Sequence, residues 1–271
     1  MSRPPFAPWR DGPPRFAVAA RPIAPERWLI PDTEAHILPD RRRTLEDREA
    51  VHRCAPDAVE AAGEAARLIA DHVGRARPDG AYPLYDVAHA VSDDLVVMIP
   101  GSGEGPGGWR AGALVLAQPT FFSLDDAFDQ ALDRLHAPVP GGAALSGRIA
   151  RLFDRLRNDV VLERFNWTLQ HGPARFTPDS APLRAAAREA GAAGADQLPV
   201  RVERQTVRRL PQTGAVLFTI RVAIDPAPAL PKPERAPLAS AWRQADAAAR
   251  RYKGWADLDA GAEALFARWS V

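Results

Sequence analysis

The pattern of apolar and polar positions is clearest between residues 199 and 224, where it predicts two long strands and a tight turn. The turn falls at 211–214 (Pro-Gln-Thr-Gly), where Gly214 supplies the positive φ that a short hairpin loop requires. The second strand, residues 216–222, is too apolar to be an exposed edge. This stretch therefore predicts a β-hairpin within a larger sheet.

The first strand of this hairpin is polar on both faces. Alternation places Arg201, Glu203 and Gln205 on one face and Val202, Arg204, Thr206 and Arg208 on the other. Charges that face a core must be paired, because an unpaired buried charge is costly. Two interpretations follow. Inward-facing charges beside an apolar strand indicate a ligand cavity, whereas an ordinary amphipathic hairpin would leave an arginine-rich face in solvent.

Periodicity elsewhere predicts the remaining elements. The expected helices cover 44–54, 56–75, 123–135, 143–156, 182–190, 237–250 and 257–269. The expected strands outside the hairpin cover 95–99, 109–117 and 162–169. Ser123, followed closely by two aspartates, is a typical N-cap. An early pair of strands, a helical insertion and three more strands favour an α+β fold, an antiparallel sheet with helices on one face.

The two ends of the chain differ from its middle. Residues 1–40 are rich in proline and arginine, so we expect an extended arm over a domain that covers 41–230. The expected anchors of this arm are Trp9, Phe16, Trp28 and Ile30. Residues 231–271 predict helices that pack on the same domain, after a proline-rich linker at 230–237.

Composition excludes several classes of function. The chain has 35 basic and 34 acidic residues, so it lacks the strongly basic balance of a nucleic-acid-binding protein. No apolar run approaches about 20 residues, and the N-terminus lacks the apolar core of a secretory signal. We therefore expect a cytoplasmic protein that binds neither nucleic acid nor membrane. The single cysteine, Cys54, excludes an internal disulfide and a cysteine-ligated iron–sulfur cluster within this chain.

Two local motifs suggest chemistry. The glycine-rich segment 101–108 lacks the Lys-Ser/Thr pair of a phosphate loop and precedes a strand, so we expect a plain hairpin loop. His136 ends a predicted helix against the proline-stiffened segment 137–140 (Ala-Pro-Val-Pro). A rigidly held neutral imidazole suits a five-coordinate haem iron. The alternative is a histidine favoured at a helix C-terminus by the helix dipole.

Several blocks of the sequence resemble the haem-dependent oxidative N-demethylase family. The specific blocks are 136–140 (His-Ala-Pro-Val-Pro) and 203–211 (Glu-Arg-Gln-Thr-Val-Arg-Arg-Leu-Pro). Weaker blocks lie at 93–98, 164–167, 218–221 and 251–254. The blocks run in family order. At 119–122, where the family has Pro-Ser-x-Trp, this chain has Pro-Thr-Phe-Phe.

The resemblance implies that residues 41–230 form a PAS-like domain whose five-stranded antiparallel sheet is one wall of a haem b pocket. It implies His136 as the ligand of the haem iron. Asn166 and Trp167 would line the pocket, Glu203 would hold the protonated amine, and Arg204 or Arg221 would polarise bound oxygen.

The resemblance also implies a reaction and partners. An N-methyl group of a small secondary amine, such as dimethylamine, would be oxidised by O₂ and released as formaldehyde. Electrons from NADPH would arrive through a partner reductase subunit that carries FMN and a 2Fe–2S cluster, and a tetrahydrofolate-binding partner would capture the formaldehyde. Two other hypotheses stay open: a non-catalytic haem- or small-ligand-binding PAS-like protein, and a structural subunit that has lost its haem.

Overall fold

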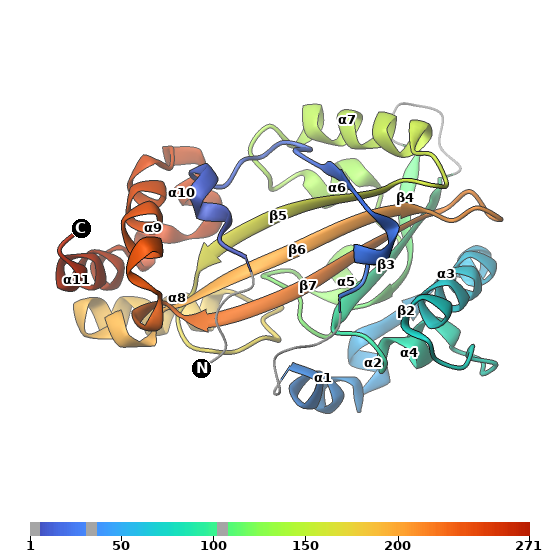
Figure 1. The fold of residues 1–271 in the computed structure, drawn as a ribbon, viewed down its shortest axis with the longest axis horizontal. Coiled ribbons are helices and arrows are strands. Elements are labelled where there is room, and N and C mark those ends of the chain that lie inside the picture. The colour runs from blue at the N-terminus through green and yellow to red at the C-terminus, as the bar shows by residue number, and fades with distance from the viewer. Residues whose placement is uncertain (1–5, 31–36, 102–107) are drawn as a thin grey trace.

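The computed structural model describes residues 6–30, 37–101 and 108–271, and the strands of this part form one open antiparallel sheet (Figure 1). The order is β1-β5-β6-β7-β3-β4-β2. The five strands expected from the sequence are its five adjacent central members: β3 Asp93–Pro100, β4 Trp109–Val115, β5 Val161–Leu169, β6 Pro199–Arg209 and β7 Val216–Pro226. The glycine-rich loop expected between β3 and β4 lies mostly outside the described residues.

The helices of the described residues flank this sheet. They are α1 Ile37–Leu45, α2 Arg48–Val51, α3 Val59–Val73, α4 Pro83–Ala88, α5 Leu124–Ala127, α6 Leu132–His136, α7 Gly142–Arg155, α8 Ala181–Ala190, α9 Lys232–Gln244, α10 Ala247–Lys253 and α11 Asp259–Trp269. None of them is long and apolar enough to span a bilayer.

The sheet has two short edge strands beyond the five expected. β1 (Arg21–Ile23) pairs with β5, and β2 (His52–Cys54) pairs with β4. The helix expected over residues 44–54 is therefore wrong. Asp47 caps the short α2, and the chain then extends because the free edge of β4 satisfies the backbone groups of β2.

The predicted hairpin is confirmed. β6 and β7 pair along their full length, and Gly214 adopts a φ of 73° in the turn. Both carboxylate oxygens of Glu64 on α3 accept backbone N–H groups of the turn, from Gln212 at 2.7 Å and Thr213 at 2.8 Å. The tip of the hairpin is thus bound to a residue 148 positions earlier in the sequence, and this contact fixes the register of the long strands at their closed end.

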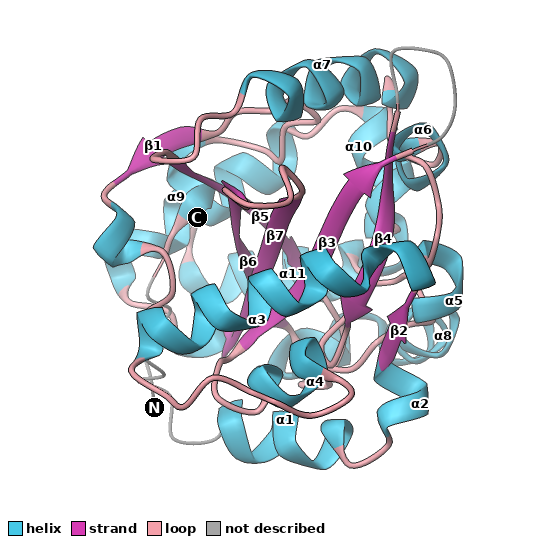
Figure 2. Cartoon of the chain, turned by 90° about the vertical axis from the view of Figure 1, so that its right-hand side faces the viewer, coloured by secondary structure: helices cyan, strands magenta, loops and turns pink. Residues whose placement is uncertain are grey.

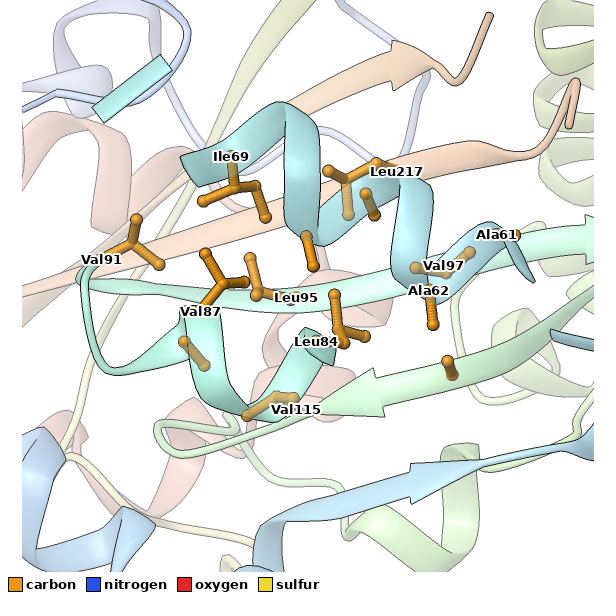
Figure 3. Packing of buried hydrophobic residues seen from close by; sticks show 14 of the residues in the cluster. Ala61, Ala62, Ile69, Leu84, Val87, Val91, Leu95, Val97, Val115 and Leu217 are labelled. Carbon is orange, nitrogen blue, oxygen red and sulfur yellow. The ribbon is translucent and has the colours of Figure 1, made fainter. Parts of the chain in front are cut away.

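Helices pack on both faces of the sheet, which corrects the expectation of a single helical face. On one face α3 and α4 cover Leu95, Val97 and Leu217 (Figures 2 and 3). On the opposite face α5 to α7 cover Val96 and Met98. Successive residues of β3 point to opposite faces, and because all of these are apolar, this strand is buried on both sides.

The helix expected over residues 123–135 is interrupted between α5 and α6. Asp129 adopts a φ of 60°, and its backbone N–H donates to the carbonyl of Ala111 at 2.9 Å. The Ala111 N–H donates in turn to the carbonyl of Gln130 at 3.0 Å. The segment stops being helical because its backbone bonds to β4 instead. The expected N-cap, Ser123, is confirmed.

The linker expected at 230–237 is wrong, because α9 begins at Lys232 and contains Pro237. Proline removes one helical hydrogen bond. Burial of Leu238 and Trp242, both 0% exposed, offsets that loss. The helix expected over 237–250 is in fact α9 followed by α10, which Asp246 caps.

The N-terminal arm crosses the front of β5 to β7 (Figure 1). Of its expected anchors, Trp9 and Trp28 are fully buried, while Phe16 and Ile30 are half-buried. The arm is less extended than expected, because it contains β1 and short 3₁₀ turns. Residues 1–5 and 31–36 lie outside the described part.

Candidate functional site

The register of β5, β6 and β7 divides the predicted site residues between the two faces of the sheet. Asn166 lies opposite Glu203, and Glu203 lies opposite Val222. We call their side of the sheet the site face. Arg204 lies opposite Arg221, one position along, so both point to the other side, which we call the arm face. The two arginines expected beside Glu203 are therefore separated from it by the sheet.

Arg204 and Arg221 are buried on the arm face and bind the N-terminal arm. Nε of Arg204 donates to Glu163 at 2.7 Å, and its Nη1 donates to the carbonyl of Trp28 at 2.7 Å. Nη1 of Arg221 donates to the carbonyl of Ile30 at 3.1 Å. The sequence could not reveal these contacts, because the arm shows no periodicity that would place it on the sheet.

Trp167 also lies on the arm face, away from its neighbour Asn166. Its ring packs against Trp9, with centroids 6.2 Å apart, and against Trp255, with centroids 5.3 Å apart. It is 3% exposed and belongs to the hydrophobic core that the C-terminal helices complete. The structure does not bring Trp167 to the site face.

Glu203 is the centre of a hydrogen-bonded network on the site face. Its Oε2 accepts from Nδ2 of Asn166 at 3.2 Å and from Nε2 of Gln205 at 2.9 Å. Oδ1 of Asn166 accepts from Nζ of Lys253 at 3.0 Å. Asn166 thus links a carboxylate to an ammonium group, and this arrangement assigns its amide oxygen and nitrogen. The expected burial of Glu203 is confirmed, since it is 7% exposed.

The electrostatics keep Glu203 charged. Burial alone would raise the pKa of Glu203, but Arg201, a hydrogen bond from Thr120 and the charge of Lys253 hold it below its usual value. Burial lowers the pKa of Lys253 to about 8; Glu203 opposes this change and Arg164 adds to it. At neutral pH Glu203 is therefore a carboxylate, and Lys253 is an ammonium group whose pKa lies close to neutral pH.

The segment 119–122 contributes directly to this network. Thr120 lies close to Glu203 and helps to lower the pKa of its carboxyl, and its backbone forms a bridge with Thr177. The next residue, Phe121, has a φ of 61°, a left-handed conformation that is unusual for a bulky side chain. The Phe121 N–H donates to the carbonyl of Thr177 at 2.7 Å. Sequence reasoning gave Thr120 no role; its only signal was the departure from the family pattern.

His136 ends α6 with its imidazole held by the preceding turn. Nδ1 lies 2.7 Å from the carbonyl oxygen of Leu132, to which the hydroxyl of Ser146 also donates at 3.0 Å. A carbonyl oxygen only accepts, so Nδ1 carries the proton and Nε2 presents a lone pair. Nε2 has no hydrogen-bond partner among the described residues. Burial lowers the pKa of His136; the Leu132 bond opposes this change and Arg164 adds to it.

The backbone after His136 is closely packed. Its carbonyl accepts from the N–H of Val139 at 2.9 Å, and Gly142 N–H donates to the carbonyl of Val139 at 2.8 Å. A Cβ added at Gly142 would lie 1.9 Å from the carbonyl oxygen of His136. Only glycine fits there, so the backbone around His136 is closely packed; the prediction that the imidazole is held rigidly stays a prediction.

An apolar strip lies beside the polar network. β7 places Ile220, Val222 and Ile224 on the site face, where they form a buried cluster with the half-buried Phe218. Glu203 of β6 pairs directly with Val222. A polar row next to an apolar row suits a ligand that is mainly apolar and carries a few polar groups.

The sequence matches the family described as haem-dependent oxidative N-demethylase, alpha subunit-like, over residues 72–260. The chain belongs to this family. The match includes His136 and Glu203, and the expected resemblance is confirmed. An alpha subunit implies other subunits. Comparison with curated proteins gives no match.

The haem dependence of this demethylase-like family can be tested against the residues present. A histidine imidazole is one of the protein groups that hold a haem iron. His136 presents a neutral ring with Nε2 available. No group of three or more His, Cys, Asp and Glu residues able to hold a bare metal ion occurs within 6–30, 37–101 and 108–271. If this chain binds haem, His136 is the described residue that would hold the iron.

A cavity of about 410 Å³ lies elsewhere in this demethylase-like chain, beside the edge strand β2. Its walls include Arg48, His52, Cys54 and Tyr82. Burial lowers the pKa of His52 to about 4, with the charges of two neighbouring arginines acting in the same direction. It contains none of the predicted site residues, so we identify the site from the chemistry of the site face.

Proposed function

We propose that this chain is the haem-bearing catalytic subunit of a system that oxidatively N-demethylates a small secondary amine. The observation that carries the proposal is His136. It is a neutral imidazole with an available Nε2, held by Leu132 and Gly142, within a chain of the demethylase family. The resemblance to a PAS domain and the division into an arm, a haem domain at 41–230 and C-terminal helices belong to the same proposal.

In this proposal His136 holds the iron, and Glu203 holds the amine. An ionised carboxylate offers about four acceptor positions. Asn166 and Gln205 already donate to Oε2 of Glu203, which leaves acceptor positions for an N–H of a protonated amine. The apolar strip of β7 receives the methyl groups. The bound haem supplies O₂ activation.

The balanced reaction needs electrons from elsewhere. One methylated amine, O₂, two electrons and two protons give the demethylated amine, formaldehyde and water. The one cysteine, Cys54, cannot ligate an iron–sulfur cluster. We therefore propose that a partner reductase with FMN and a 2Fe–2S cluster transfers electrons from NADPH, and that a tetrahydrofolate-binding subunit captures formaldehyde. A cytoplasmic location follows from this use of NADPH.

Formaldehyde release tests this function. The haem-loaded chain with dimethylamine, O₂ and NADPH should release none above background, and adding a flavin/iron–sulfur reductase should start turnover. Sustained release without the reductase would contradict the assignment of the electron carriers to a partner. Haem binding and reduction without amine-dependent turnover would favour the alternative, a non-catalytic haem-binding PAS-like protein.

A substitution of Glu203 tests its proposed role. Glu203→Gln should weaken amine binding about 10- to 100-fold, because a charge-assisted hydrogen bond contributes roughly 1.5–3 kcal/mol. Its haem content should equal that of the wild type. Glu263→Gln, which removes an exposed carboxylate from α11, is the matched control. Unchanged amine affinity in Glu203→Gln would remove Glu203 from the amine site.

A further inference from the structure

Arg164 lies on the site face without a counter-ion among the described residues. It points from β5 to the same side as Asn166 and Glu203, and its side chain is half-buried. Its Nε is buried without a hydrogen-bond partner, and Arg164 makes no hydrogen bond or ion pair within 4.0 Å to a described residue. A guanidinium has five N–H donors, and buried donors without acceptors are costly. An unsatisfied group of this kind indicates a missing acceptor.

Two other arginines of the sheet do find protein acceptors for part of their guanidinium groups. Arg201, also on the site face, donates to the carbonyl oxygens of Gln118 at 2.7 Å and Arg175 at 3.1 Å. Arg204, on the arm face, pairs with Glu163. Both are fully buried and donate to protein acceptors, although the Nε of Arg201 also lacks a partner. Arg164 donates to no acceptor among the described residues. Arg208 shares this property, but its guanidinium stacks on the ring of Trp28.

Glu203 does not neutralise Arg164. Burial lowers the pKa of Arg164, and the charge of Glu203 opposes this change without reversing it; the two side chains make no ion pair within 4.0 Å. Oε2 of Glu203 is bonded to Asn166 and Gln205. Lys253 adds a second positive charge and donates to the neutral amide of Asn166. Arg164, Lys253 and Arg201 thus accompany one carboxylate, so positive charge is in excess on this part of the site face.

We propose that Arg164, supported by Lys253, is a receptor for a carboxylate carried by the ligand of the site face. A guanidinium matches a carboxylate with two parallel N–H donors. The carboxylate has two possible sources: a propionate of the haem, or the acid group of an amine substrate such as an N-methyl amino acid. Both sources rest on the proposed function. The recognition of a carboxylate by Arg164 does not depend on it.

Titration with two porphyrins tests the first source. The full chain, Arg164→Gln, Arg164→Lys and Arg208→Gln are titrated with haem and with haem dimethyl ester, which lacks propionate charge. Arg208 is a half-buried arginine of the same sheet that stacks on Trp28, 4.7 Å from the ring centroid, and is the matched control. A propionate receptor predicts that Arg164→Gln weakens haem binding about tenfold or more, with no difference for the ester. Arg164→Lys should recover part of the affinity.

Calorimetry with two amines tests the second source. N-methylglycine carries a carboxylate, and dimethylamine does not. A substrate receptor predicts that Arg164→Gln weakens binding of N-methylglycine about tenfold or more and leaves dimethylamine binding unchanged. The measurement is made on the chain as purified and again after haem loading, with circular dichroism confirming that each variant is folded.

Either selective loss supports the carboxylate receptor and names its source. If Arg164→Gln binds haem, the ester and both amines as the wild type does, the proposal is overturned. If no variant and no wild-type chain binds haem, the proposed function fails, but the calorimetric comparison on the purified chain still decides whether Arg164 binds a carboxylate.

Discussion

Nδ1 of His136 lies 2.7 Å from the carbonyl oxygen of Leu132, four residues earlier on the same helix. This contact determines the tautomer and leaves Nε2 available to a ligand. Burial favours the neutral ring, which is the form that binds iron. The contact within one helical turn thus gives His136 the tautomer and the neutral charge that a haem ligand requires, and the family resemblance assigns this role to His136.

The position of His136 depends on Gly142, and a pair of substitutions tests this dependence. Gly142→Ala places a Cβ 1.9 Å from the carbonyl oxygen of His136, so we expect the free energy of unfolding to fall by about 1–3 kcal/mol. Haem affinity should fall as well. Gly147→Ala, on the same helix, meets only the guanidinium of Arg151 at 3.6 Å and should raise stability by about 0.5–1 kcal/mol. Urea unfolding measures both; equal effects would contradict the packing argument.

Arg204 should stabilise the fold without acting on the ligand. Arg204→Gln breaks a buried pair with Glu163, so we expect a loss of about 3–5 kcal/mol in the free energy of unfolding. Glu163 has a second partner, Arg21, whose side chain is 69% exposed. Arg21→Gln should therefore lower the free energy of unfolding by less than about 1 kcal/mol. The folded Arg204→Gln protein should bind haem as tightly as the wild type. A large loss of haem affinity with unchanged stability would show that Arg204 takes part in ligand binding and would contradict this prediction.

The burial of Lys253 predicts a pH dependence of stability. Its pKa falls from an ordinary value near 10.4 to about 8 in the folded chain. The unfolded chain then holds the proton between about pH 8 and pH 10, so raising the pH over this range favours the folded state. Wild type should therefore gain stability relative to Lys253→Met as the pH rises from 7 to 9.5. Urea unfolding at both pH values measures this gain, and a constant or opposite difference would contradict it.

Local patterns predicted much of the sheet. The apolar run 216–222 and Gly214 specify the hairpin, and alternation alone placed Glu203 and Arg204 on opposite faces. The edge strand His52–Cys54 was missed because it depends on pairing with β4, a partner about 60 positions away in sequence. Pro237 suggested a linker because propensity carries no information about the burial of Trp242.

The candidate site was only partly accessible from sequence. His136 was identifiable because histidine and the prolines that stiffen its surroundings are adjacent in the chain. The link from Glu203 through Asn166 to Lys253 joins three separate elements, and only the folded chain brings them together. Arg221 and Arg204 looked catalytic beside Glu203 because their contacts to the N-terminal arm leave no trace in the local pattern.

The central claim is that this chain binds haem through His136, and a spectroscopic titration of the purified protein with haem tests it most directly. The account predicts a Soret band that saturates at one haem per chain in the wild type and in His89→Ala and His171→Ala. His136→Ala should bind at least about tenfold more weakly or show a weakly ligated spectrum, with added imidazole restoring the wild-type band. An unchanged titration and spectrum for His136→Ala would contradict the account.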